Sequence, residues 1–411
     1  LGNIFTEELV KIFAIGFKGQ KLDLTVKFVK IILWALIFIG INNIVITYLQ
    51  LNDNFKTPGL IGIPYNVIII ASIIISKGTN FYVLIIGSLI ALISQVLFQL
   101  PAVKRTGFKY NLKVDFKDEN VKYLIILILP VLIGGGVEQV NTLIDGTLAS
   151  TFGEGVVTSF NYANRLYGFV SSIFVVSILS VVYPIMAKTS AAEDTKAFKI
   201  SIKKTLNIIL MFIIPICVGT LVLSGPIVKL LFERGKFNES DTIMTANILM
   251  VYIISILAFS LRNVISRAFY SLHDTKTPMI NGAIAIVFNI VLNIVLSKYM
   301  GYLGLAIATT IAAYIGLVIF LVTLKKRIGS FDGKSILATA IKSIISAAIM
   351  GIATSICYNQ LANVLGVGLI SQVIHLGLSI LVGVVVYSIL ILILKVEETQ
   401  IVLDMIKKKI K

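Results

Sequence analysis

The chain contains apolar runs that are each about 20 residues long, and this length sets the strongest limit on its fold. Clear examples are residues 31–49, 206–223 and 376–394. A helix of about 20 apolar residues crosses roughly 30 Å of hydrocarbon, whereas a membrane β-barrel shows short segments of alternating polarity. Charged residues make up only 14% of the 411 residues, against roughly 25% in soluble domains. The sequence therefore predicts an all-α, polytopic membrane protein.

We predict about eleven transmembrane helices from these runs. Their ranges are 24–50, 60–77, 80–101, 121–148, 155–187, 203–224, 243–271, 278–297, 302–324, 335–357 and 368–395. Residues 397–411 are too charged to span and are rich in Lys, which is typical of a cytoplasmic tail or a helix on the membrane surface.

The net charge of +16 comes mostly from short connections between the predicted spans. Basic residues concentrate in 103–122, 188–204 and 325–342. Because basic loops remain on the cytoplasmic side, these connections and the C-terminus are predicted to lie inside. Residues 11–30 and 225–242 then fall outside although both carry Lys. The membrane orientation accounts for the charge, so we expect no nucleic-acid partner.

Two parts of the chain match each other at a spacing of 220 residues. The matched positions are Phe17, Asn43, Lys56, Thr57, Pro58 and Gly62 in the first copy, and Phe237, Asn263, Lys276, Thr277, Pro278 and Gly282 in the second. Chance similarity between apolar helices would match Leu and Ile, not a shared Asn and a shared Lys-Thr-Pro. An even number of predicted spans separates the copies, so both keep one orientation. This is a parallel repeat, which is one of the architectures of transporters.

The repeat also predicts that the protein is longer than this chain. Three predicted spans precede the second copy, between residues 121 and 224, and none precedes the first. We therefore expect about 100 further residues before residue 1, which is Leu.

Ionisable side chains inside spans are candidates for function, because inserting one costs roughly 2.5–3.5 kcal/mol. The fourth predicted span carries Gln139, Asn141 and Asp145. Asn141 and Asp145 are four residues apart and share a helix face. Asp145 would suit a cation or an Arg partner. The alternative is a polar contact that only joins helices.

The next span carries Tyr162, Asn164 and Arg165. Arg165 stays charged in any protein environment, and its planar guanidinium suits phosphate. On the wall of a span it would bind an anion in an internal cavity. The alternative is that it reaches the membrane interface, because it lies near the external end of its span.

Oxygen-bearing side chains occur again in the eighth and ninth predicted spans. Asn289 and Asn293 share a helix face, and Thr309 lies in the following span. Amide, hydroxyl and carboxylate oxygens are hard ligands that suit Na⁺, although such residues also simply link helices.

Four charged residues lie toward the cytoplasmic end of the seventh predicted span and just beyond it. They are Arg262, Arg267, Asp274 and Lys276. Anchoring at the interface explains Arg262 and Arg267 together with the neighbouring His273, and substrate entry or gating by the four charged residues is the functional alternative.

The sequence lacks the motifs of nucleotide-binding proteins and metalloproteases. It has no Walker motif, no glycine-rich dinucleotide fingerprint and no His-Glu-x-x-His motif. Cys217 and Cys357 lie in predicted spans without the spacing of metal ligands. We expect a transporter rather than an enzyme, with no cofactor unless Na⁺ serves as a coupling ion.

The chain resembles the MurJ (MviN) family of lipid II flippases, within the multidrug/oligosaccharidyl-lipid/polysaccharide exporter superfamily. The stretches that carry the resemblance are 139–145, 162–166 and 269–278, which read QVNTLID, YANRL and FYSLHDTKTP. The resemblance implies fourteen spans, of which this chain holds the fourth to the fourteenth. In these terms the chain divides into the last three spans of an N-terminal lobe (1–102), a cytoplasmic linker (103–120), a six-span C-terminal lobe (121–325), two further spans that form a groove for a lipid tail (335–395) and a basic cytoplasmic tail (396–411).

The resemblance also implies roles for particular residues. Arg165 would bind the diphosphate of lipid II in a central cavity, and the cavity lining would include Asn164, Tyr162, Asn141 and Gln139. A Na⁺ site would comprise Asp145, Asn289, Asn293, Leu305 and Thr309. Asn293 stands where an Asp can occur in the family, which makes this site less anionic.

We therefore expect a monomeric flippase in the bacterial inner membrane, surrounded by membrane lipids. It would carry lipid II, a peptidoglycan precursor, from the cytoplasmic to the outer leaflet by alternating access, and the membrane potential or Na⁺ would bias the cycle. An exporter of another lipid-linked oligosaccharide and a drug/cation antiporter are the near alternatives. A polyprenyl-phosphate transferase would need paired acidic residues with a divalent metal, and the sequence shows no such pair.

Overall fold

Helices that are long and apolar enough to cross a membrane make up most of the chain. The structure is a computed structural model that describes residues 3–76, 80–107, 119, 142–192, 194–366, 368–396 and 398–399. Ten such helices occur among these residues, each overlapping one predicted span, and no strand occurs among them. The remaining predicted span, 121–148, lies outside the described residues except at its end, where residues 142–149 are helical.

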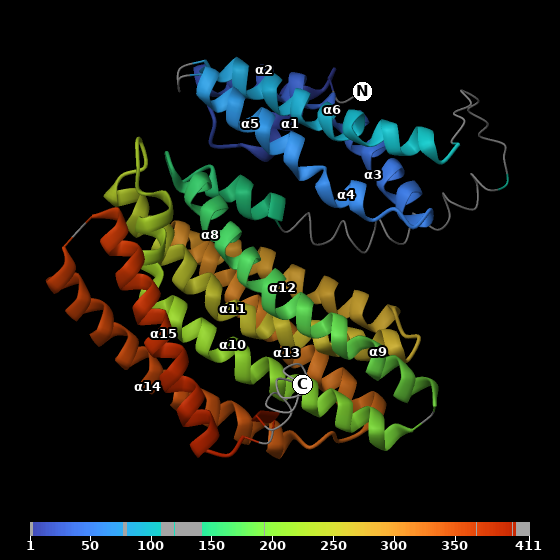
Figure 1. Ribbon diagram of the computed structural model, residues 1–411, viewed down its shortest axis with the longest axis vertical. Helices are drawn as coiled ribbons and strands as arrows, with labels where there is room; N and C mark the ends of the chain where they lie inside the picture. The colour runs from blue at the N-terminus through green and yellow to red at the C-terminus, as the bar shows by residue number, and fades with distance from the viewer. Residues whose placement is uncertain are drawn as a thin grey trace. The chain divides into compact units, whose positions relative to one another are not determined.

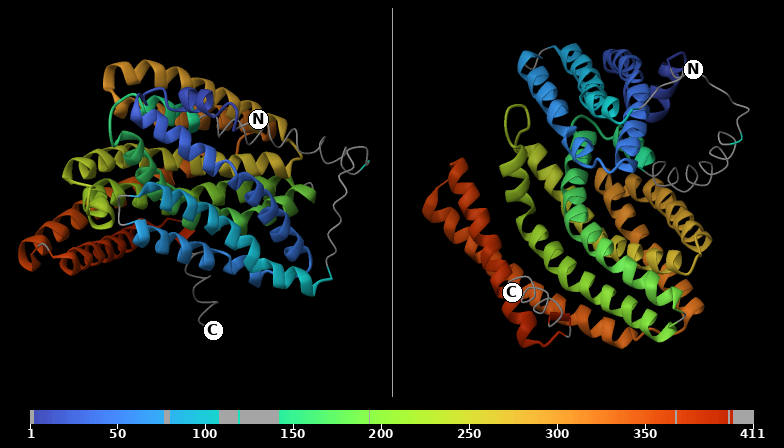
Figure 2. Two further views of the ribbon diagram at one scale, coloured as in Figure 1. Left: turned by 90° about the horizontal axis from the view of Figure 1, so that it is seen from above. Right: turned by 45° about the vertical axis from the view of Figure 1, so that its right-hand side comes forward.

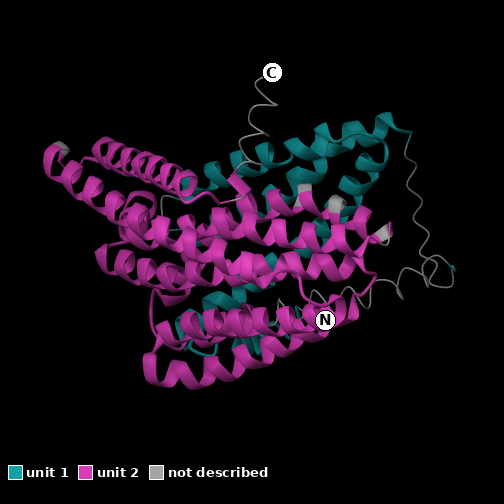
Figure 3. Cartoon of the chain, turned by 90° about the horizontal axis from the view of Figure 1, so that it is seen from below, with its two compact units in different colours: residues 1–132 teal, residues 133–411 magenta. Residues whose placement is uncertain are grey.

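The chain divides into two compact units, residues 1–132 and 133–411 (Figure 3). The helices of the first are α1 (Thr6–Phe13), α2 (Gln20–Ile32), α3 (Ala35–Leu51), α4 (Lys56–Leu60), α5 (Gly62–Ser76) and α6 (Phe81–Arg105). Helix α6 contacts α2, α3 and α5. Gln99 Nε2 on α6 donates a hydrogen bond to Asn42 Oδ1 on α3 (2.7 Å). Such polar contacts hold helices together where lipid removes the hydrophobic driving force.

The second unit is built around α10 and α11. Its helices are α8 (Val156–Val170), the π-helical segment η1 (Ser171–Val176), α9 (Ser177–Ala191), α10 (Thr195–Phe232), α11 (Glu239–Ser271), α12 (Lys276–Met300), α13 (Tyr302–Ile328), α14 (Gly333–Leu365) and α15 (Leu369–Ile393). Helix α11 contacts α8, α9, α10 and α13, and α12 contacts α13. Helices α14 and α15 lie side by side and pack on α10 (Figures 1 and 2).

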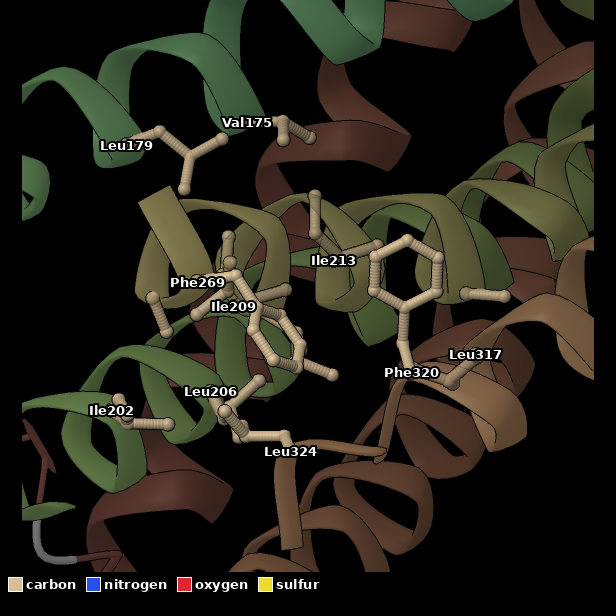
Figure 4. Packing of buried hydrophobic residues seen from close by; sticks show 14 of the residues in the cluster. Val175, Leu179, Ile202, Leu206, Ile209, Ile213, Phe269, Leu317, Phe320 and Leu324 are labelled. Atoms are coloured by element: carbon tan, nitrogen blue, oxygen red, sulfur yellow. The ribbon is translucent and has the colours of Figure 1, made fainter. Parts of the chain in front are cut away.

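One apolar face of α10 forms the largest core cluster of the second unit. Ile202, Leu206, Ile209 and Ile213 recur at spacings of three and four and are all fully buried, as the helical period requires. They pack near Phe269 of α11 and near Phe320 and Leu324 of α13 (Figure 4). This packing joins α10, α11 and α13 through one shared core.

The predicted basic tail does not begin as a free segment. Val396 is 2% exposed and Glu398 is 1% exposed. Asn207 on α10 donates a hydrogen bond through Nδ2 to Glu398 Oε1 (2.6 Å). The start of the tail is therefore held against α10.

The two copies of the predicted repeat share a local structure. Asp53 and His273 have φ angles of 59° and 58°. The next residues are Asn54 and Asp274, and their backbone N–H groups reach back to the carbonyls of Leu49 (2.9 Å) and Phe269 (3.0 Å). These bonds have the pattern of a Schellman motif, which ends a helix at a left-handed residue. Because the motif recurs at the same spacing as the sequence match, the structure supports the repeat.

Asn54 and Asp274 then begin the following helix in the same way. Their Oδ1 atoms accept hydrogen bonds from the N–H groups of Thr57 (3.1 Å) and Thr277 (2.9 Å). The prolines of the two Lys-Thr-Pro stretches lie in the first helical turn, where a missing N–H costs nothing. The copies differ beyond this point, because α4 ends at Leu60 whereas α12 continues without a break.

Helices α12 and α13 approach each other closely at Gly304. A Cβ atom at this position would overlap the carbonyl of Leu296 on α12 and would lie 2.7 Å from the Leu296–Ser297 amide nitrogen. We expect Gly304→Ala to lower the free energy of unfolding by about 1–3 kcal/mol, because neither backbone can shift cheaply. Thermal unfolding in detergent measures the change.

The matched control is Gly282→Ala on α12, where a Cβ would meet nothing within 4 Å. Ala is the better helix former, so this variant should be as stable as the parent or up to about 1 kcal/mol more stable. Equal stability of the Gly304→Ala variant and the parent would contradict the close approach.

Candidate functional site

A network of hydrogen bonds surrounds Asp145 and joins three helical segments of the second unit. Asn293 Nδ2 on α12 donates to Asp145 Oδ1 (2.6 Å) and to Asn289 Oδ1 (2.8 Å). The Thr309 hydroxyl on α13, which has one hydrogen to donate, lies within hydrogen-bond distance of both Asp145 Oδ2 (3.3 Å) and the Leu305 carbonyl (3.1 Å). Asn289 Nδ2 donates to Thr309 Oγ1 (3.2 Å). The structure thus brings together all five residues of the expected cation set.

Local sequence explains how each helix supplies two members of this network. Asn289 and Asn293 are four residues apart on α12, and Leu305 and Thr309 are four apart on α13, so each pair shares a face. Gly301 turns the chain between the two helices with a φ of 58°. This turn and the close approach at Gly304 set the two polar faces opposite each other.

The oxygen atoms of this network fit a small monovalent cation. Asn293 is fully buried, and its Oδ1 has no hydrogen-bond partner among the described residues. Turning the amide of Asn293 by 180° would point this oxygen at the oxygens of Asp145 and Asn289, which now accept from its nitrogen. Oxygens that converge in this way are stabilised when a cation lies between them. A set with a single carboxylate suits Na⁺ better than a divalent ion.

The surroundings of Asp145 are consistent with this fit. No Lys or Arg in the described part of the chain forms an ion pair with it. The same part holds no group of three or more His, Cys, Asp or Glu residues of the kind that binds transition metals.

The residues expected to line a headgroup cavity take different positions. Arg165 and Asn164 are exposed on α8. The ring of Tyr162 is stacked on Phe232 at 4.3 Å between centroids and meets the edge of Phe237 at 5.5 Å. Gln139 and Asn141 lie outside the described residues. Among the described members, Arg165 and Asn164 are therefore exposed, whereas Tyr162 packs in an aromatic cluster.

The two arginines expected near the cytoplasmic end of α11 have separate surroundings. The Arg262 guanidinium is half-buried and lies over the rings of Phe259 (5.1 Å) and Phe320 (5.9 Å). It sits roughly 13 Å along the helix from the end of α11, at a rise of 1.5 Å per residue. Arg267 is exposed and lies over Tyr183 (5.2 Å) and Tyr270 (6.0 Å). Arg262 therefore lies farther from the end of the span than a side chain that anchors a helix at the membrane interface.

Asp274 lies in the turn between α11 and α12, and Lys276 begins α12. The backbone N–H and then the hydroxyl of Thr277 donate to the Asp274 carboxylate, and they hold its pKa below its usual range. Lys276 is exposed at the first residue of α12. The hydrogen bonds give Asp274 a structural role as the cap of α12.

Two features near the site were not predicted. One is the π-helical segment η1, which directly follows α8 and interrupts the span predicted at 155–187. The other is Tyr252 on α11, a polar group in an apolar run, which is buried beside Phe160 and Tyr167 of α8 at 5.8 and 6.3 Å between ring centroids. A lone tyrosine at the middle of a span was the only signal in the sequence, and many such residues merely pack.

The chain matches the sequence model of the family described as lipid II flippase MurJ over residues 1–375. It is 30% identical to a probable lipid II flippase MurJ of Rickettsia prowazekii, over 94% of this chain and 77% of that protein. It is 33% identical to the corresponding protein of Vibrio cholerae serotype O1, over 57% of this chain and 45% of that protein. The matched stretches therefore span between about half and three quarters of these relatives.

Solved structures agree with the sequence matches. A structure of lipid II flippase MurJ in an inward closed conformation superposes with a TM-score of 0.78 at 27% identity, covering 95% of this chain and 78% of that one. An inward-facing multidrug transporter of the MATE family superposes with a TM-score of 0.68 at 14% identity, covering 81% and 78% of the two chains. The second likeness shows a shared fold alone. The chain belongs to the MurJ family of lipid II flippases.

Proposed function

We propose that this chain carries lipid II, the lipid-linked precursor of peptidoglycan, across the bacterial cell membrane. The family match along residues 1–375 is the observation that carries this proposal. The multi-pass helical fold and the buried polar network of the second unit support it, because transporters place polar sites at membrane depth.

Arg165 is the residue proposed to hold the diphosphate of the substrate. Its side chain is exposed on α8, and a guanidinium offers paired N–H donors that match phosphate oxygens. Asn164 beside it would add a neutral donor. The uncharged sugars and the lipid tail of the substrate would be recognised elsewhere.

Asp145, Asn289, Asn293, Thr309 and the Leu305 carbonyl are proposed to hold Na⁺. A bound cation would supply positive charge that neutralises Asp145 inside the membrane, where an unpaired carboxylate is costly. In this proposal the amide of Asn293 turns so that its oxygen faces the cation. The hydrogen bond between Asn289 and Thr309 holds α12 and α13 together.

The alternation of basic connections supports a cytoplasmic C-terminus, and we propose that the protein acts as a monomer. Rocking of two lobes would expose the headgroup site to each side of the membrane in turn. The likeness to drug exporters does not favour drug transport, because it extends to the fold alone.

Growth of a bacterium depleted of its own lipid II flippase tests the proposal. The 411-residue chain is expressed alone and, in parallel, joined to the three N-terminal spans of a family relative. We expect the longer form to restore growth and normal cell shape. Failure of a longer form that is abundant in the membrane would contradict the proposal and favour another lipid-linked oligosaccharide as substrate.

A further inference from the structure

The helix that carries Arg165 is the least hydrophobic of the ten membrane-type helices in the described part of the chain. It runs from Val156 to Leu179, and the protein buries only a small part of it. The other helices that the protein leaves mostly uncovered are more apolar, as contact with lipid requires. Polar side chains in a span face the protein interior or water. The exposed polar surface of α8 is therefore suited to water and a polar ligand, not to lipid tails.

The residues of α8 divide between two opposite faces. One face is buried in the cluster that α8 shares with α11 and α13, and it includes Val156, Phe160 and Ala163. The other face is exposed and polar, and its members recur at helical spacings of three and four. These exposed members are Thr158, Asn161, Asn164 and Arg165.

The exposed surface changes character on the C-terminal side of Arg165. Phe169, Ile173 and Val176 are exposed there and are apolar. Ser172 lies among them, and its hydroxyl donates to the Phe169 carbonyl (3.0 Å). Exposure alone therefore does not account for the polar side chains of the first half of the helix. Arg165 stands at the boundary between a polar and an apolar exposed half.

The polar half continues the proposed diphosphate site along the helix. Asn161 precedes Arg165 by about 6 Å along the axis and Thr158 precedes it by about 10 Å, at a rise of 1.5 Å per residue. A sugar that is esterified to a diphosphate lies directly beside it. Amide and hydroxyl side chains provide neutral donors and acceptors, which match the hydroxyl and acetamide groups of a sugar.

We infer that Asn161 and Thr158 bind the N-acetyl sugar that is attached to the diphosphate, and that Asn161 determines the specificity for it. The inference rests on the proposed diphosphate site at Arg165 and goes beyond it by naming the side chains that recognise the sugar. Tyr162 does not belong to this face, because its ring is stacked on Phe232.

The test compares two synthetic probes of equal charge by calorimetry on the purified chain. One is farnesyl diphosphate that carries N-acetylglucosamine on its terminal phosphate, and the other carries a methyl group there. Asn161→Ala should weaken binding of the sugar probe by about 3-fold to 10-fold, because neutral hydrogen bonds are lost. It should leave binding of the methyl probe within about 2-fold of the parent. Thr158→Val, which keeps the shape and removes the hydroxyl, should act in the same direction.

Ser172→Ala is the matched control on the same helix. It also removes an exposed polar group, but on the apolar side of Arg165, so both probes should bind as in the parent. Arg165→Ala should weaken both probes alike, because both carry the diphosphate.

The outcomes separate the inference from the proposed function. If Asn161→Ala weakens both probes equally, Asn161 does not distinguish the sugar and the inference is overturned while the diphosphate site stands. If Asn161→Ala changes neither affinity, another part of the protein covers this face and the inference is again overturned. If the parent binds neither probe, the proposed diphosphate site fails and the sugar site fails with it.

Discussion

In the longer form of the chain, Arg165→Ala should abolish the rescue of growth in the flippase-depleted bacterium. The substitution removes a fixed positive charge and paired donors from α8, while the exposed position keeps the cost to folding small. A hydrogen bond to a charged group contributes about 1.5–3 kcal/mol, so the affinity for a diphosphate should fall on the order of 10-fold to 100-fold. Growth rescue and calorimetry with farnesyl diphosphate measure the two effects.

Two variants define how specific the loss is. Arg165→Lys keeps the charge but loses the planar pair of donors, and it should bind the diphosphate more weakly than the parent and more tightly than Arg165→Ala. Arg234→Ala removes an exposed arginine that donates to the Leu231 carbonyl (3.0 Å), and it should rescue growth like the parent. Full rescue by Arg165→Ala would remove this residue from the mechanism.

The spans could be predicted because apolar length alone determines them. All ten membrane-type helices of the described residues coincide with predicted ranges. Their ends were less predictable, since helices continue past the hydrocarbon. Helix α10 was predicted at 203–224 but begins at Thr195, where the Asp194 side chain accepts from the Ala197 N–H (2.9 Å), and it continues through Pro215 and Pro226.

The candidate site could be predicted only in parts. The spacing of Asn289 and Asn293 places both on one face of a helix, but hydrophobicity does not say which face turns toward Asp145. The resemblance to a family supplied that grouping, and the distances in the structure show that the five residues do meet. Tyr252 was missed because its ring contacts with Phe160 and Tyr167 depend on the packing of α8 against α11, which no local pattern encodes.

Asp145→Asn should remove the response of the protein to Na⁺. The new side chain has the same shape but no charge, so the converging oxygens lose their only carboxylate. A ligand at 100 times its dissociation constant stabilises a protein by about 2.7 kcal/mol, which raises the unfolding temperature. We expect Na⁺ to raise the unfolding temperature of the parent in detergent, relative to choline, and to leave that of Asp145→Asn unchanged.

The stability of Asp145→Asn without Na⁺ gives an independent check. A neutral amide costs less to bury than a carboxylate that has no ion-pair partner among the described residues, so this variant should be at least as stable as the parent in choline chloride. Asp194→Asn is the matched control, because Asn also caps helices well and α10 supplies no residue to the network. A Na⁺ response that persists in Asp145→Asn would place the cation elsewhere.

Asn293→Asp should strengthen the response of the protein to Na⁺, which Asp145→Asn removes. Asn293 now donates to Asp145 over 2.6 Å, and a second carboxylate there would set two negative charges side by side. Without Na⁺ this repulsion should lower the unfolding temperature below that of the parent. With Na⁺ the added charge should tighten binding, so the Na⁺-dependent rise in unfolding temperature becomes larger than in the parent. Opposite shifts from Asp145→Asn and Asn293→Asp would tie the Na⁺ response to the charge of this one network, because a general salt effect would leave both variants alike.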